Sequence, residues 1–151
     1  MTEPSLPELP GRIELSAPAD PAIIDLLHGL LEQVWLRHPD VEDADRIRFE
    51  MAVVEVLANI VEHAYRLDQP AGDGQRRFTV CLAVTPEALQ AAFADNGLPM
   101  ELDLSRVAMP DEHAESGRGL ALAAAALDDL AYSRNDGRNH WRLLCLRGRP
   151  R

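Results

Sequence analysis

Three polar side chains recur every four residues in the middle of the chain. If residues 43–66 form a helix, Glu55, Asn59 and His63 fall within about 80° of one another, because each residue turns a helix by about 100°. Asparagine is a weak helix former, which indicates that its amide bonds to something outside the helix. The alternative is the solvated face of a core-packing helix, and periodicity alone does not separate the two.

A second motif, Asp95-Asn96-Gly97-Leu98-Pro99-Met100, comes directly off the end of a predicted strand. At a strand end Asp95 can accept a hydrogen bond from a ligand amine, and Gly97 lets a ligand ring approach the backbone. Asp and Gly after a strand are equally typical of an ordinary turn, so that alternative stays open.

A third motif, Ser116-Gly117-Arg118-Gly119-Leu120, leads into a predicted helix. Glycines before a helix bring backbone amides to its positive end, where phosphates bind. A flexible hinge or a glycine N-cap would have the same sequence. Arg118 is the one cation in this motif, and it is either a phosphate contact or a solvated side chain.

These motifs need helices to position them, and the apolar periodicity predicts three. The first has Asp20 as N-cap and Pro21 as first helical residue, and it ends at His38-Pro39. The second covers residues 43–66, with Arg48 and Glu62 on its polar side. The third is Ala-rich, and one of its faces carries Leu120, Ala123, Ala124 and Leu127.

Alternation of apolar and polar residues predicts five strands. They are a short edge strand at 12–15, a hairpin from 78–84 and 89–93, and a second pair from 130–134 and 140–146. Asn135-Asp136-Gly137 forms the turn of the second pair. The order β-α-α-β-β-α-β-β predicts an α+β fold, a two-layer α/β sandwich whose mostly antiparallel sheet is covered on one face by three helices. Residues 96–117 lack periodicity, and we expect a mobile loop there.

Composition excludes several classes of protein. The 151 residues carry a net charge of −10, so general binding of nucleic acid through phosphate neutralisation is not expected. The chain has no lysine, which excludes Schiff-base chemistry and a Walker-type phosphate site. No apolar run is long enough to cross a membrane, and two cysteines, Cys81 and Cys145, make no disulfide framework. We therefore expect a cytoplasmic protein that binds neither membrane nor nucleic acid directly.

The three motifs in chain order resemble those of a known family. Glu-x-x-x-Asn on a helix, Asp-x-Gly off a strand and Gly-x-Gly into a helix are similar to the N, G1 and G2 boxes of the GHKL (Bergerat-fold) ATPases. The chain most resembles the anti-sigma-factor serine kinases of bacterial partner-switching systems. The stretches that carry this likeness are residues 55–65, 95–99, 117–120, 128–132 and 137–139.

The resemblance implies ATP and Mg²⁺ as ligands and assigns roles to the motif residues. Glu55 would be the catalytic base, Asn59 would coordinate Mg²⁺, and His63 would support the nucleotide site. Asp95 would read the adenine amino group, and Gly97 would shape the adenine pocket. The residues that would meet the phosphates, under a lid made by the preceding loop, are Gly117, Arg118, Gly119 and Leu120.

One departure from the family pattern concerns the last strand. Gly137-Arg138-Asn139 stands where a Gly-Thr pair often precedes that strand, so one hydroxyl expected to contact the ligand is missing.

The resemblance also implies a function and partners. It predicts an ATP-dependent serine/threonine protein kinase that binds a sigma factor or other regulatory client and phosphorylates a STAS-domain anti-sigma-factor antagonist. Homodimers formed through the first strand and first helix are a further expectation. Residues 12–147 would be the ATPase domain, between a leader at 1–11 and a tail at 148–151. The alternatives are a non-catalytic partner-binding switch module on the same fold and an ATPase without a protein substrate.

Overall fold

The computed structural model describes residues 11–66, 76–99 and 118–148. The elements in chain order are β1 (Ile13–Pro18), α1 (Ile23–Arg37), α2 (Asp43–Arg66), β2 (Arg77–Val84), β3 (Ala88–Asp95), α3 (Arg118–Ala126), β4 (Asp129–Asn135) and β5 (Arg138–Leu146). This is the predicted order of strands and helices. Several predicted segments lie outside the described residues. They are residues 116–117 of the third motif, most of the predicted loop, the leader up to residue 10 and the tail beyond 148.

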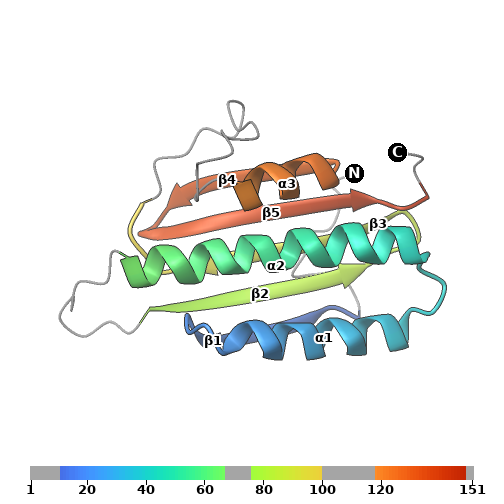
Figure 1. The fold of residues 1–151 in the computed structure, drawn as a ribbon, viewed down its shortest axis with the longest axis horizontal. Helices are drawn as coiled ribbons and strands as arrows, with labels where there is room; N and C mark the ends of the chain where they lie inside the picture. The colour runs from blue at the N-terminus through green and yellow to red at the C-terminus, as the bar shows by residue number, and fades with distance from the viewer. Residues whose placement is uncertain (1–10, 67–75, 100–117, 149–151) are drawn as a thin grey trace.

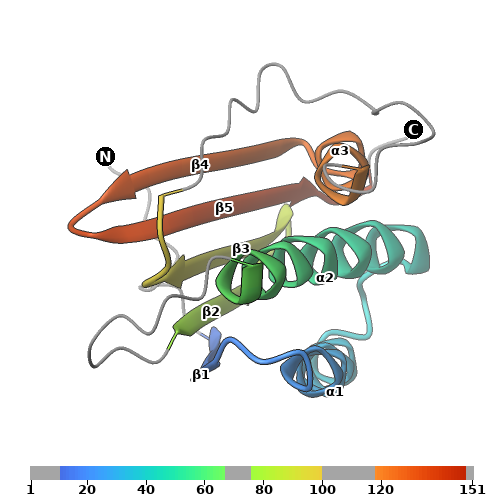
Figure 2. The same ribbon diagram turned by 60° about the vertical axis from the view of Figure 1, so that its left-hand side comes forward.

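The strands form one sheet in the order β1-β2-β3-β5-β4, and neighbouring strands are antiparallel throughout. β1 and β4 are the edges, as predicted for the first strand. Figures 1 and 2 show all three helices on the same face of the sheet. The predicted α+β two-layer fold is therefore confirmed.

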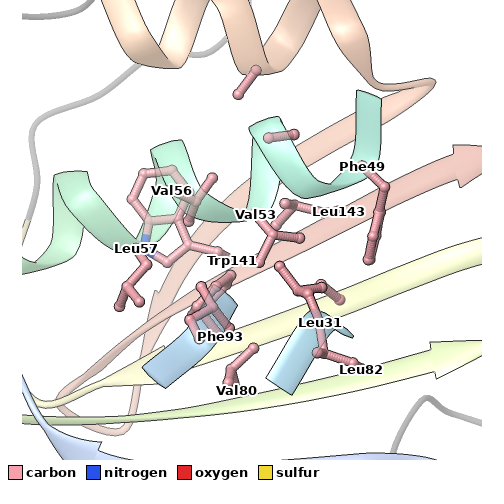
Figure 3. Packing of buried hydrophobic residues seen from close by; sticks show 14 of the residues in the cluster. Leu31, Phe49, Val53, Val56, Leu57, Val80, Leu82, Phe93, Trp141 and Leu143 are labelled. Carbon is pink, nitrogen blue, oxygen red and sulfur yellow. The ribbon is translucent and has the colours of Figure 1, made fainter. Parts of the chain in front are cut away.

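The core lies between α2 and the sheet (Figure 3). Val53, Val56 and Leu57 of α2 point at Trp141 of β5 and Phe93 of β3, and all five side chains are buried. Burying one such side chain contributes about 1.5–3 kcal/mol. Side chains alternate between the two faces of a strand, so every second residue of each strand faces the helices. The same alternation decides which polar side chains at the strand ends face the helices.

The start of the first helix differs from the prediction. The helix begins at Ile23 with Ala22 as its N-cap residue, two residues later than predicted, but Oδ1 of Asp20 accepts the backbone N–H of Ala22 (2.9 Å), the type of bond predicted for a capping Asp. The backbone N–H groups of Ile23 and Ile24 bond to the carbonyls of Asp20 and Pro21 (2.9 and 3.2 Å).

The β4–β5 turn agrees with the prediction. Asp136 and Gly137 both have positive φ, 55° and 73°. That combination defines the two-residue hairpin turn whose twist matches the flanking strands, and it explains the Asp-Gly pair.

Arg48 has a different environment from the solvated one that the helix periodicity allowed. Its guanidinium is largely buried between α2, α3 and the end of β5: it donates to the carbonyls of Ala126 (2.9 Å) and Leu146 (3.2 Å) and to Oδ1 of Asp45 (2.8 Å). The physical reason is that α3 packs on this side of α2 and leaves carbonyl groups that need donors.

Cys81 and Cys145 are both buried free thiols. Burial raises the pKa of the Cys81 thiol, and the nearby Glu14 carboxylate adds to the rise. A raised pKa lowers the fraction of reactive thiolate.

Candidate functional site

Asp95 ends β3 on the face of the sheet that the helices cover, and its side chain is buried. Its Oδ1 accepts two hydrogen bonds, from the backbone N–H of Gly97 (2.8 Å) and from Nδ2 of Asn139 (2.8 Å). Its Oδ2 is buried and has no hydrogen-bond partner among the described residues. A buried acceptor left without a donor is costly, so this oxygen is suited to a donor that a ligand supplies.

Gly97 packs closely against the Asp95 carboxylate, and the approach of a ligand ring predicted for this residue stays a prediction. A Cβ on this residue would come within 2.9 Å of Oδ1 of Asp95 and 3.7 Å of Nδ2 of Asn139. The Asp95 oxygen is held by two hydrogen bonds and cannot easily move aside. Glycine is therefore required here for packing against the carboxylate, a reason distinct from left-handed backbone geometry.

His63, near the C-terminal end of α2, contacts the same segment. Its Nε2 lies 3.2 Å from the carbonyl oxygen of Leu98, and because a carbonyl only accepts, Nε2 carries the proton in this contact. The bond joins the helix to the chain that follows β3. The supporting role of His63 in a nucleotide site stays a prediction.

Glu55 and Gly119 are in direct contact across α2 and α3. A Cβ on Gly119 would collide with Oε2 of Glu55 and lie 3.2 Å from its Cδ. The carboxylate thus lies against the first turn of α3, where backbone N–H groups have no partner within the helix. Asn59 lies one helical turn beyond Glu55 on α2. It is half-buried and interacts with another group of the protein.

The remaining predicted residues are placed only in part. Leu120 is in the first turn of α3 with its side chain buried in the core, so only its backbone N–H is available to a ligand. Arg118 begins α3, but the position of its side chain lies outside the described part of the chain, as does Gly117. The structure therefore brings the first and third motifs together, through the contact of Glu55 on α2 with Gly119 on α3. The second motif, which begins at Asp95, contacts the end of α2 through His63.

Sequence reasoning missed Asn139, which it noted only as a departure from a family pattern. The side chain is completely buried directly opposite Asp95 in the β3–β5 register. Tyr132 and Arg134 of β4 contact it from the neighbouring strand. An alternation count would have put Asn139 on the covered face with Trp141, and a polar residue at such a position was the available signal.

The described residues contain no group of three or more His, Cys, Asp or Glu side chains that could hold a metal. Mg²⁺ commonly binds through one or two protein oxygens together with substrate phosphates, which needs no such group. The amide oxygen of Asn59, one helical turn from Glu55 on α2, fits that mode of binding.

Residues 17–144 match the family described as histidine kinase-like ATPase domain. The chain belongs to this family. The match covers all three motifs and Asn139, and it agrees with the ATPase resemblance that the motifs carried. ATP use is a property of this histidine kinase-like ATPase family.

Curated relatives of this histidine kinase-like ATPase domain are serine-protein kinases. The chain is 25% identical over 138 residues to the serine-protein kinase RsbW of Bacillus cereus (strain Q1), covering 83% of this chain and 79% of the relative. It is 27% identical over 137 residues to RsbW of Bacillus licheniformis, covering 83% and 80%.

Two solved structures share the fold. The RsbU and RsbW domains of Rv1364c from Mycobacterium tuberculosis superpose with a TM-score of 0.63 at 20% identity, over 92% of this chain and 33% of that one. The present chain thus spans about a third of that protein. A chain of the SiaB–SiaC complex from Pseudomonas aeruginosa superposes with a TM-score of 0.58 at 18% identity. The match covers 89% of the present chain and 89% of that chain.

Among the described residues, no helix combines the length and the apolar character needed to cross a membrane.

Proposed function

We propose that this protein is an ATP-dependent protein serine kinase of the anti-sigma type, which binds a sigma factor or other regulatory client and phosphorylates a STAS-domain antagonist of it. The observation that carries the proposal is the contact of the Glu55 carboxylate with Gly119. It places a proton acceptor against the helix end that is suited to phosphate groups. The serine-protein kinase relatives support the same reaction.

The adenine end of the site would be held by Asp95 and Gly97. Oδ2 of Asp95 would accept the exocyclic amino group of adenine, which supplies the donor that this buried oxygen lacks among the described residues. Gly97 keeps the rim of the pocket free of a side chain, and His63 holds the carbonyl of Leu98 in place.

The phosphate end would be held by α2 and α3. Asn59 would bind Mg²⁺, which when present neutralises phosphate charge. The groups proposed to meet the phosphates are the backbone N–H groups of Gly117, Gly119 and Leu120 and the side chain of Arg118.

In the reaction that we propose, Glu55 accepts the proton of a serine hydroxyl on the partner. The serine oxygen forms a bond to the γ-phosphorus of ATP, the bond from that phosphorus to the bridging oxygen breaks, and ADP leaves with the electron pair. Glu55 does not need to touch the metal. Its place one helical turn from Asn59 keeps base and metal ligand separate.

The test is transfer of radiolabelled γ-phosphate to purified STAS-domain proteins from the same organism. Glu55→Gln is expected to lower transfer at least 100-fold, because base catalysis contributes roughly 10²–10⁴-fold, while ATP binding by calorimetry is kept. Asn59→Ala is expected to lose Mg²⁺-dependent binding. Glu32→Gln, an exposed glutamate on α1, is the matched control and should behave as wild type.

Two results would reject the kinase. If wild-type protein binds no ATP, the nucleotide site is wrong. If a STAS-domain partner binds equally to wild type, Glu55→Gln and Asn59→Ala and is never phosphorylated, the protein is a non-catalytic switch module.

We also propose the extents and assembly that the sequence predicted. Residues 12–147 form the ATPase domain, and homodimers would form through β1 and α1. β1 is an edge strand that pairs only with β2 within the described sheet, which leaves one side of its backbone for a partner.

A further inference from the structure

The carboxamide of Asn139 is fully committed to hydrogen bonds. Its Nδ2 donates to Oδ1 of Asp95 (2.8 Å) and to the carbonyl of Leu98 (2.9 Å). Its Oδ1 accepts from the hydroxyl of Tyr132 and from Nη1 of Arg134 (3.1 Å). Two donors and two acceptor sites are all that an asparagine side chain has. The partners also fix its orientation, because carboxylate and carbonyl only accept and guanidinium only donates.

Arg134 ties the same cluster to the chain after β3. Its Nη1 donates to the carbonyl of Gly97 (2.7 Å) as well as to Asn139. Asn139 and Arg134 therefore hold three groups of the proposed adenine pocket by hydrogen bonds. These groups are the Asp95 carboxylate, the Gly97 carbonyl and the Leu98 carbonyl. Tyr132 supports them from one side, with its ring packed on Trp141 at 4.8 Å between centroids.

This cluster decides which oxygen of Asp95 is available. Oδ1 is occupied by the Gly97 N–H and by Asn139, so rotation of the carboxylate would break two hydrogen bonds. Oδ2 is left as a buried acceptor without a partner among the described residues. A fixed buried acceptor favours a ligand donor and disfavours a ligand acceptor at the same point.

We propose that Asn139, with Tyr132 and Arg134, is the element that makes the nucleotide site selective for a 6-amino purine over a 6-oxo purine. The inference rests on the proposed function and extends it from one residue, Asp95, to the residues that fix the orientation of Asp95. Asn139, Tyr132 and Arg134 are positioning residues, since they act on the base through Asp95. Adenine offers an amino group to Oδ2, whereas guanine offers a carbonyl oxygen that the carboxylate repels.

The test is the ratio of ATP to GTP affinity, measured by calorimetry with Mg²⁺ for wild type and three variants. Asn139→Leu keeps the approximate volume and removes both amide functions. Tyr132→Phe removes one bond to Asn139, and Arg134→Met removes another together with the bond to the Gly97 carbonyl. These positions are half-buried and exposed, and folding is expected to survive both changes. His140→Ala is the control, because the neighbouring side chain on β5 points to the opposite face of the sheet.

We expect the ATP:GTP affinity ratio to fall roughly tenfold in Asn139→Leu, as for loss of about one buried hydrogen bond, and roughly threefold in each single-donor variant. His140→Ala should keep the wild-type ratio. Thermal unfolding of each variant without nucleotide shows which of them are folded. A role in stability alone would lower ATP and GTP affinity together and leave the ratio unchanged.

The outcomes separate this inference from the proposed function. Wild-type protein that binds neither nucleotide overturns the proposed function, and this inference with it. Wild-type protein that prefers ATP, with an unchanged ratio in the folded variants, overturns the inference alone. If Asn139→Leu does not fold, Tyr132→Phe and Arg134→Met decide the question.

Discussion

At the scale of single residues, a glycine and a glutamate share one space at the junction of α2 and α3. The Glu55 carboxylate occupies the volume that a side chain at position 119 would need. Because the obstacle is the far end of a flexible side chain, a larger residue at 119 would displace Glu55 and leave the backbone of α3 in place. The glycine is therefore a condition for the observed position of the Glu55 carboxylate, which we propose as the catalytic base.

Gly119→Ala tests that relation. Alanine suits the helix better than glycine by roughly 0.5–1 kcal/mol, so the free energy of unfolding should stay within about 1 kcal/mol of wild type. Phosphate transfer is expected to fall by about 100-fold, since a displacement of about 1 Å at a reacting group can have that effect. Gly29→Ala on α1, where a Cβ meets nothing within 4 Å, is the matched control. Unchanged transfer in a folded Gly119→Ala protein would contradict the role given to the contact.

At the scale of elements, one ion pair joins two helices and a strand. Arg48 of α2 donates to the last carbonyl of α3 and the last carbonyl of β5, while Oδ2 of its partner Asp45 accepts the N–H of Gly148 (2.9 Å). Burial alone would raise the pKa of Asp45, but the hydrogen bonds from Gly148 and Arg48 outweigh it and lower the pKa below its ordinary value. The carboxylate form is thus stabilised by folding.

The pH dependence follows from that direction. A folded-state pKa below the unfolded value, about 3.9 for Asp, gives stability that is complete above the unfolded pKa and is lost as the pH falls towards the folded one. Denaturant unfolding of wild type and Asp45→Asn between about pH 6 and 3 should give curves that converge in acid, with the variant less stable at pH 6. Asp43→Asn is the control, because that carboxylate is 92% exposed. A constant gap between the wild-type and Asp45→Asn curves would show that the charge of Asp45 does not contribute.

The elements themselves could be predicted because each has a local signal. α2 begins and ends at the predicted residues, since a 3.6-residue apolar period and flanking breakers specify a long helix without tertiary information. The strand order β1-β2-β3-β5-β4 had no such signal, because β3 and β5 are separated in sequence by a helix and a strand. For the same reason the Asn139–Asp95 bond, 44 residues apart, could not be read from either motif alone.

At the scale of the whole molecule, the positive residues at the C-terminal end do not act as one strip. Six arginines lie among residues 134–151. Arg134 belongs to the Asn139 cluster, and Arg147 bonds to the Thr85 carbonyl and Oδ2 of Asp40, both at 2.8 Å. Arg138 and Arg142 are exposed on the sheet face away from the helices. Half of the described positive charge in this region is therefore structural.

The proposed nucleotide site also involves the whole molecule, because its proposed contacts come from α2, α3 and the end of β3, and β5 holds Asp95 in place through Asn139. A ligand that binds the folded state alone stabilises it by RT ln(1 + [L]/Kd), about 2.7 kcal/mol at 100 times Kd. For a domain of this size that is a rise in Tm of roughly 5–10 °C. We expect this rise with ATP and Mg²⁺ in wild type and in Glu55→Gln, because the carboxylate proposed as the catalytic base is not needed for nucleotide binding.

Asp95→Asn should remove most of that rise, because an amide nitrogen can replace the acceptor that faces the adenine amine while Oδ1 keeps its hydrogen bonds to Gly97 and Asn139. Differential scanning fluorimetry against a series of ATP concentrations measures all three proteins under one condition. If Asp95→Asn is stabilised as much as wild type, the nucleotide does not reach the end of β3. A nucleotide that reaches from the end of β3 to the start of α3 cannot leave Asp95 out, so the full shift in that variant would place ATP binding elsewhere on the fold.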